Sequence, residues 1–79
     1  MSIKVYGTNW CGGTRRVLKQ LDDKNISYIY IDIDQESGAA ELVKKLNNGY
    51  RSVPTLVFDD GTKLTEPGQI DLDKKLASL

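Results

Sequence analysis

The sequence predicts a single α/β domain over residues 1–79, in which a four-stranded mixed sheet is flanked by three helices. Apolar residues alternate in four short segments, as in strands, and recur with helical spacing in three others. These segments follow in the order β-α-β-α-β-β-α. The initial β-α-β unit implies two parallel strands joined by a right-handed crossover. The last two strands are separated by a tight turn and form an antiparallel hairpin, so the expected sheet is mixed.

The first half of the chain contains two expected strands and one expected helix. Residues 3–6 form a short strand with alternating apolar positions, which Gly7 ends. A helix is expected from near Cys11 to Asp23, where Lys24-Asn25 stops it. Residues 27–33 are β-branched and aromatic, with isoleucines on one face and tyrosines on the other, which makes them the strongest strand of the sequence.

The second half contains a helix, a hairpin and a closing helix. The helix over residues 39–46 has apolar residues at i, i+3, i+4 and i+7, and Asn47-Asn48-Gly49 ends it. Strands over residues 55–58 and 62–65 enclose Asp59-Asp60-Gly61, which contains the favoured Asp-Gly turn pair. The expected closing helix follows Pro67-Gly68 and is marked by Leu72, Leu76 and Leu79.

Composition excludes several classes of function. Eleven basic and eleven acidic residues give no net charge, which argues against nucleic acid as a partner. No apolar run approaches the roughly 20 residues that span a bilayer, and the first residues lack the apolar region of a signal peptide. The absence of histidine excludes histidine-centred catalysis and most zinc sites. We therefore expect a soluble, cytoplasmic monomer that binds neither nucleic acid nor membranes.

The single cysteine, Cys11, is the candidate reactive group. It lies where a loop after a strand opens a helix, and a helix N-terminus stabilises a thiolate through free N–H groups and a partial positive charge. Gly12 and Gly13 permit close backbone approach, and the Thr14 hydroxyl can donate to the sulfur. Residues 1–21 contain four basic residues and no acid, which also favours the thiolate.

Plainer interpretations of these residues stay open at this level. Free cysteines are often buried and behave as small hydrophobic residues. Trp10 can pack on the core, and Arg16 and Lys19 are typical of the solvated face of a helix. Pro54 begins a strand, and composition alone favours a trans peptide bond before it. Spacing does not show whether the loop of Pro54 lies near Cys11.

Four motifs together resemble the glutaredoxin family, most closely its short bacterial mycoredoxin-like and glutaredoxin-like branch. The resemblance covers Ile3 to about Leu76. The motifs are Tyr6-Gly7-Thr8-x-Trp10-Cys11-x-x-x-Arg15, Ile31-Asp32-Ile33-Asp34, Arg51-Ser52-Val53-Pro54-Thr55 and Asp60-Gly61-Thr62.

The resemblance implies a thioredoxin-like fold with Cys11 as the catalytic nucleophile. It implies a cis Pro54 that faces Cys11, and a Val53 backbone that pairs with an extended substrate. The thiolate would be stabilised by Gly12, Thr14 and Arg15. The residues implied to bind glutathione or a similar low-molecular-weight thiol are Trp10, Arg51, Val53, Pro54, Thr55 and Thr65. Arg51 would meet a carboxylate of that thiol.

The resemblance also has departures. The usual Gly-Gly-x-x-Asp pattern is missing around residues 65–68, and Glu66 would repel a carboxylate of the thiol. Dithiol members carry a second cysteine where this chain has Thr14, so the motif Cys-Gly-Gly-Thr implies a monothiol mechanism. The expected partners are proteins with mixed disulfides and the small thiol as cosubstrate, with no tightly bound cofactor and no metal.

Two alternatives remain from the same resemblance. Members with a Cys-Gly-Phe-Ser motif share Gly12 and a hydroxyl at Thr14, and some hold an iron–sulfur cluster between two protomers through one cysteine of each and two glutathione thiols. An iron–sulfur carrier that uses Cys11 is therefore one alternative. A glutaredoxin relative without redox activity is the other.

Overall fold

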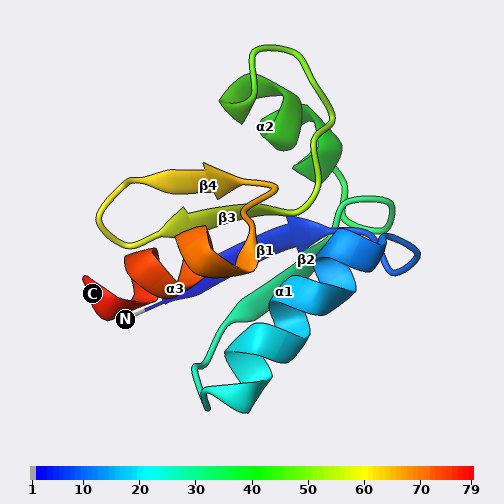
Figure 1. Cartoon of the computed structure of the whole chain (residues 1–79). Coiled ribbons are helices and arrows are strands. Elements are labelled where there is room, and N and C mark those ends of the chain that lie inside the picture. Colours follow the sequence, from blue (N-terminus) through cyan, green and yellow to red (C-terminus); the bar gives the residue numbers. More distant parts are fainter. Residues whose placement is uncertain (1) are drawn as a thin grey trace.

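The computed structural model of the chain describes residues 2–79, and its elements follow the predicted order (Figure 1). Met1, the first residue of the expected domain, lies outside the described residues. The elements are β1 (Ile3–Gly7), α1 (Gly12–Asp23), β2 (Ile29–Asp32), α2 (Ala39–Leu46), β3 (Thr55–Phe58), β4 (Lys63–Thr65) and α3 (Gln69–Ala77).

The four strands form one mixed sheet in the order β2-β1-β3-β4. β1 runs parallel to β2 and antiparallel to β3, with Val5 opposite Tyr30 on one side and Leu56 on the other. β3 and β4 form the predicted antiparallel hairpin. Because β1 and β3 pair antiparallel, the end of β1 and the start of β3 lie side by side, with Tyr6 opposite Thr55. This sheet and its three helices confirm the expected thioredoxin-like fold.

Helices cover both faces of the sheet, so two apolar clusters form (Figure 1). The larger cluster joins β1 and β3 to α1 and α3. The smaller cluster joins the opposite face of the sheet to α2. Their fully or largely buried members are Ile3, Val5, Val17, Leu21, Leu56, Phe58 and Leu72 in the first, and Tyr6, Ile33, Ala39 and Val43 in the second.

Strand β2 is shorter than the predicted residues 27–33, and it lies at the edge of the sheet. Its two faces alternate as expected. Tyr28 and Tyr30 pack on the larger cluster, and Ile31 and Ile33 belong to the smaller one. Ile29 remains 51% exposed. Both faces are apolar because each meets a helical layer.

Element ends agree with the turn residues, with three corrections. β1 was expected to stop before Gly7, but Gly7 is its last residue and pairs with Asp32. β4 begins at Lys63 instead of at residue 62. α3 ends at Ala77, so the half-exposed Leu79 is not part of it.

A polar network around Asn47 holds the end of α2 to the hairpin. The largely buried Asn47 Nδ2 donates to Val43 O at 2.9 Å and to Thr55 Oγ1 at 3.0 Å. Thr65 Oγ1 donates to Asn47 Oδ1 at 2.5 Å. The segment between α2 and β3 is therefore fixed at both ends.

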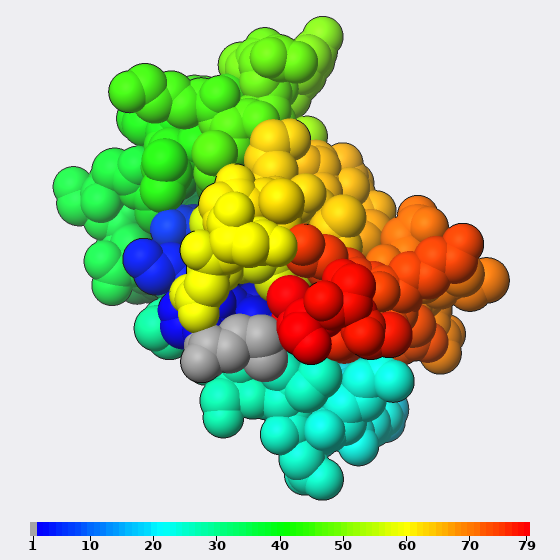
Figure 2. All heavy atoms as spheres, turned by 90° about the vertical axis from the view of Figure 1, so that its left-hand side faces the viewer, coloured from blue at the N-terminus to red at the C-terminus, as the bar shows by residue number. Residues whose placement is uncertain are grey.

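The C-terminal helix is fastened to the hairpin turn. Lys75 Nζ forms an ion pair with Asp60 Oδ2 at 2.8 Å and lies 5.0 Å from the centroid of the Phe58 ring. Figure 2 shows the end of the chain lying against the yellow hairpin. Among the described helices, none is long and apolar enough to span a membrane.

Candidate active site

Cys11 is the N-cap residue of α1, with extended backbone angles of φ −84° and ψ 121°. Its N–H donates to Thr8 O at 3.3 Å, and its carbonyl accepts the N–H of Arg15 at 3.2 Å. The side chain is partly buried. The sulfur therefore lies at the start of a helix, where the first N–H groups have no partner within the helix.

Local hydrogen bonds lower the pKa of the Cys11 thiol. The backbone N–H of Thr14 has the largest effect, and the burial of the sulfur opposes it. The Thr14 hydroxyl and the Gly13 N–H also lower the pKa, whereas the negative charge of Glu66 raises it. Hydrogen bonds to the charged form outweigh the opposing effects, so the pKa of Cys11 lies below that of an ordinary thiol.

Thr14 lies in the first turn of α1, three residues after Cys11, and is fully buried. Among the described residues, no protein nitrogen or oxygen is a hydrogen-bond partner of its Oγ1, which leaves the hydroxyl proton available to the sulfur. Thr14 fits only because Gly7 has no side chain. A Cβ on Gly7 would lie 2.5 Å from both Cγ2 and Oγ1 of Thr14. Sequence reasoning gave Gly7 no role of this kind, although a glycine inside a strand is itself a sign of close approach.

The loop before β3 lies directly against Cys11. The Val53–Pro54 peptide bond is cis, as the family resemblance implies and contrary to the composition-based expectation. Cys11 Sγ lies 3.8 Å from the carbonyl oxygen of Val53. A Cβ on Gly13 would lie 3.3 Å from Pro54 Cδ, so Gly13 is the glycine that permits close approach. Around Gly12, by contrast, the space is open.

A groove of about 290 Å³ opens at the sulfur. Its walls come from the start of α1, the cis-proline loop and the segment between β4 and α3. The lining residues are Cys11, Gly13, Arg16, Val53, Pro54, Glu66, Pro67 and Gly68.

Arg16 is part of this groove and not merely of a solvated helix face. Its guanidinium donates to Gln20 Oε1 at 2.9 Å and to the carbonyl oxygen of Pro67. It therefore ties α1 to the segment that follows β4. Arg15 is exposed, and its side chain has no hydrogen bond or ion pair within residues 2–79.

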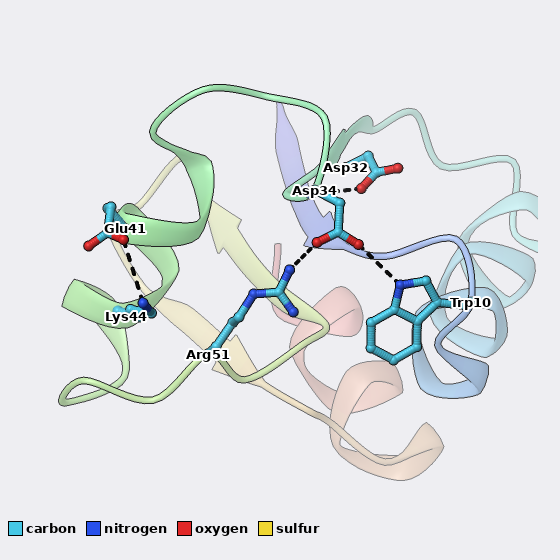
Figure 3. A network of polar contacts seen from close by, with 6 residues as sticks. All are labelled: Trp10, Asp32, Asp34, Glu41, Lys44 and Arg51. Carbon is cyan, nitrogen blue, oxygen red and sulfur yellow. Dashed lines mark hydrogen bonds and ion pairs between the residues drawn. The ribbon is translucent and has the colours of Figure 1, made fainter.

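Trp10, the residue before Cys11, belongs to a surface network with Asp34 and Arg51 (Figure 3). Trp10 is 69% exposed and does not pack on the core, and its Nε1 donates to Asp34 Oδ2 at 3.1 Å. The guanidinium of Arg51 forms an ion pair with Asp34 Oδ1. The N–H of Asp34 donates to Asp32 Oδ1 at 2.9 Å. Arg51, the cation expected to meet a thiol carboxylate, is thus paired with a carboxylate of its own chain.

Thr55 and Thr65 lie opposite each other on β3 and β4. Thr55 Oγ1 donates to Ser52 O at 2.8 Å, and both hydroxyls bond to Asn47. Their side chains therefore support the loop, and a contact with the thiol ligand stays a prediction. Asn47 and Asp34 were missed as organising residues because their partners are distant in the sequence.

Comparison with known proteins gives the family. A glutaredoxin family model matches residues 3–62. The chain belongs to the glutaredoxin family. It is 40% identical to mycoredoxin 1 of Corynebacterium glutamicum over 99% of this chain and 96% of that protein. It is 37% identical to a glutaredoxin of Mycobacterium tuberculosis over 99% and 93% of the two chains.

The fold is also shared with solved structures. The thioredoxin-like protein BC3987 superposes with a TM-score of 0.75 at 27% identity, covering 94% of this glutaredoxin and 97% of that chain. Membership of the glutaredoxin family supports thiol–disulfide oxidoreductase activity. Residues 2–79 contain no group of three or more Cys, Asp or Glu side chains placed to hold a metal ion.

Proposed function

We propose that this glutaredoxin reduces mixed disulfides between proteins and a low-molecular-weight thiol by a monothiol mechanism. The observation that carries the proposal is the environment of Cys11. Its pKa is lowered by the start of α1, and it faces the cis-proline loop while Thr14 occupies the place of a second cysteine. Cys11 is the single cysteine of the chain, so a resolving thiol must come from another molecule.

The first step is an exchange of one disulfide for another. The Cys11 thiolate attacks the small-thiol sulfur of the mixed disulfide, and the sulfur–sulfur bond to the protein breaks. Cys11 becomes disulfide-bonded to the small thiol, and the released protein thiolate takes a proton from water. In the second step an external thiolate attacks the small-thiol sulfur. This leaves a small disulfide and restores the Cys11 thiolate, so the external thiol supplies the electrons.

The groove around Cys11 would orient the small thiol. The Val53 backbone and Pro54 lie against the sulfur, and the exposed Trp10 and Arg51 flank the site. The similarity to mycoredoxin 1 supports a low-molecular-weight thiol as cosubstrate, such as glutathione or mycothiol. We expect the protein to act as a monomer in the cytoplasm, where thiols are kept reduced.

Turnover of a glutathionylated or mycothiolated peptide tests this proposal. Cys11→Ser is expected to abolish turnover, because the nucleophile is lost, whereas Thr14→Ala is expected to retain it at a reduced rate. Full activity in Cys11→Ser would refute the assignment. Trapping of Cys11 by each oxidised thiol, followed by mass spectrometry, identifies the cosubstrate.

A further inference from the structure

Glu66 occupies an unusual position in the wall of the Cys11 groove. Its backbone has a φ of +47°, in the left-handed region that non-glycine residues seldom adopt. The Glu66 N–H donates to Pro54 O at 2.8 Å, which fixes this backbone against the cis-proline loop. The carboxylate is thus carried on an anchored residue that lines the same groove as Cys11.

The charges around the groove are not equally available to a ligand. Arg51 is paired with Asp34, and Arg16 donates to Gln20 and to the Pro67 carbonyl oxygen. The side chain of Glu66, in contrast, has no hydrogen bond or ion pair with any described residue. Its charge acts on the sulfur, because it raises the pKa of Cys11. Glu66 is therefore the charged group of the groove that is still available for a ligand.

We propose that Glu66 is a specificity-determining residue that favours disulfides carrying a positive charge beside the sulfur and disfavours those carrying a carboxylate. The inference rests on the proposed function, since it concerns the disulfide that Cys11 attacks. An ammonium group near Glu66 would gain an ion pair at a partly exposed site, whereas a carboxylate would meet repulsion. For such a site the effect is about two- to fivefold for each sign of charge.

Small symmetrical disulfides provide the first test. Reduced wild-type and Glu66→Gln proteins are reacted with cystamine, bis(2-hydroxyethyl) disulfide and 3,3′-dithiodipropionate, which are cationic, neutral and anionic. Mass spectrometry gives the rate at which Cys11, the single cysteine, is modified. Each wild-type rate is divided by the Glu66→Gln rate for the same disulfide. Intrinsic disulfide reactivity then cancels, and any change in the Cys11 pKa scales all three ratios equally.

The ratio is expected to fall from cystamine to the neutral disulfide to the anionic one, with about a fourfold or larger total spread at low salt. The spread should shrink as ionic strength rises. Glu36→Gln removes an exposed carboxylate that lies in a different hollow, beside Tyr6 and Ile31, and should give equal ratios. Glu66→Asn, which suits a positive φ, should reproduce Glu66→Gln if the latter folds poorly.

A second test locates the positive charge on the target protein or on the small thiol. Peptides with Lys or Glu beside a cysteine capped by 2-mercaptoethanol carry the charge on the peptide side alone. Ratios that differ between the Lys and Glu peptides show that Glu66 interacts with charges of the target protein. Ratios that differ only among the small disulfides show that it interacts with charges of the small thiol. Equal ratios in both sets would overturn the inference. If wild-type Cys11 reacts with none of these disulfides, the proposed function itself fails.

Discussion

The sulfur of Cys11 lies at the first turn of α1, where the N–H groups of Gly13 and Thr14 stabilise its negative charge. The basic residues of the first quarter of the chain contribute differently from what their number suggests. Arg15 is exposed on the helix, and Arg16 is bonded to the segment after β4. Thiolate stabilisation at this site therefore depends mainly on the backbone and on one hydroxyl.

Replacement of Thr14 by Val tests the contribution of that hydroxyl. Val keeps the branched shape in a buried position but cannot donate to the sulfur. We expect the pKa of Cys11 to rise toward the ordinary thiol value of about 8.5, because the hydroxyl is lost. The rise should be partial, because the Thr14 N–H remains. Alkylation by iodoacetamide at neutral pH should slow accordingly, since less thiolate is present. The measurement is the alkylation rate against pH.

Thr8→Val is the matched control for this prediction. Thr8 is also fully buried, and its hydroxyl has no hydrogen-bond partner among the described residues. Its hydroxyl is not expected to influence the sulfur. An equal midpoint for wild type and Thr14→Val would show that the Thr14 hydroxyl has no role. A wild-type midpoint no lower than that of an unstructured peptide thiol measured in parallel would contradict the lowered pKa.

At the scale of elements, the site forms where the end of β1, the start of α1 and the cis-proline loop meet. β1 and β3 are adjacent and antiparallel, so the residues after β1 and those before β3 lie at the same edge of the sheet. The segment after β4 lies at the same edge, because β4 pairs with β3 and the Glu66 N–H donates to Pro54 O. Sheet order thus brings three distant segments to one sulfur.

Gly7→Ala tests the packing between β1 and α1. The added methyl group would lie 2.5 Å from two atoms of the buried Thr14, whose short branched side chain has little freedom to move. We expect the free energy of unfolding to fall by about 1–3 kcal/mol, as for other overpacked cores. Urea unfolding measures this change.

The double variant Gly7→Ala with Thr14→Ala identifies the cause. It removes Cγ2 and Oγ1 of residue 14, so part of the lost free energy of unfolding should be recovered. The effects of the two substitutions are then non-additive, as expected for neighbouring residues. Gly12→Ala is the control, because no atom lies within 4 Å of the added Cβ. Stability that is unchanged in Gly7→Ala would contradict the close contact between β1 and α1.

At the scale of the whole molecule, a net charge of zero conceals ion pairs that join different elements. Asp60 in the hairpin turn pairs with Lys75 of α3, and the lysine and Thr62 hold the pKa of Asp60 well below its usual range. The pKa of Asp73 on α3 is lowered by Gln20 and Lys24 of the α1 region. These carboxylates link α3 to the hairpin and to α1.

Acid is therefore expected to weaken the fold. A folded-state pKa below the unfolded value of about 3.9 means that the Asp60 contribution is present above that value and is lost as the pH falls through the lower, folded pKa. Asp60→Asn should lower Tm relative to wild type at pH 6, and the difference should close in strong acid. Thermal unfolding between pH 2 and pH 7 measures it.

The ion pair of Asp60 with Lys75 lies partly in solvent, which gives two further expectations. Since the carboxylate is solvent-exposed, added salt should reduce the difference in Tm. Glu36→Gln removes another exposed carboxylate, one that no lysine or arginine of residues 2–79 pairs with, and should leave Tm at pH 6 close to that of wild type. A constant difference between wild type and Asp60→Asn across this range would contradict the role of the ion pair.

The local patterns of the sequence were enough to predict the order of elements, the turn residues and the place of Cys11 at the start of a helix. Periodicities of 2 and 3.6 depend on neighbouring residues, as do the stops at Asn25, Asn48 and Gly61, whose φ values are positive. The cis bond before Pro54 was predicted from the family resemblance and not from these local patterns.

Which distant groups meet depends on the folded arrangement of strands and helices. It placed Gly7 against Thr14, paired Arg51 with Asp34, joined Asn47 to both hairpin strands, and left Glu66 available in the groove. The physical reason is that these contacts depend on strand order and on the packing of helices against both faces of the sheet. Residues far apart in the chain become neighbours only when the sheet forms, and no local pattern records the identity of their partners.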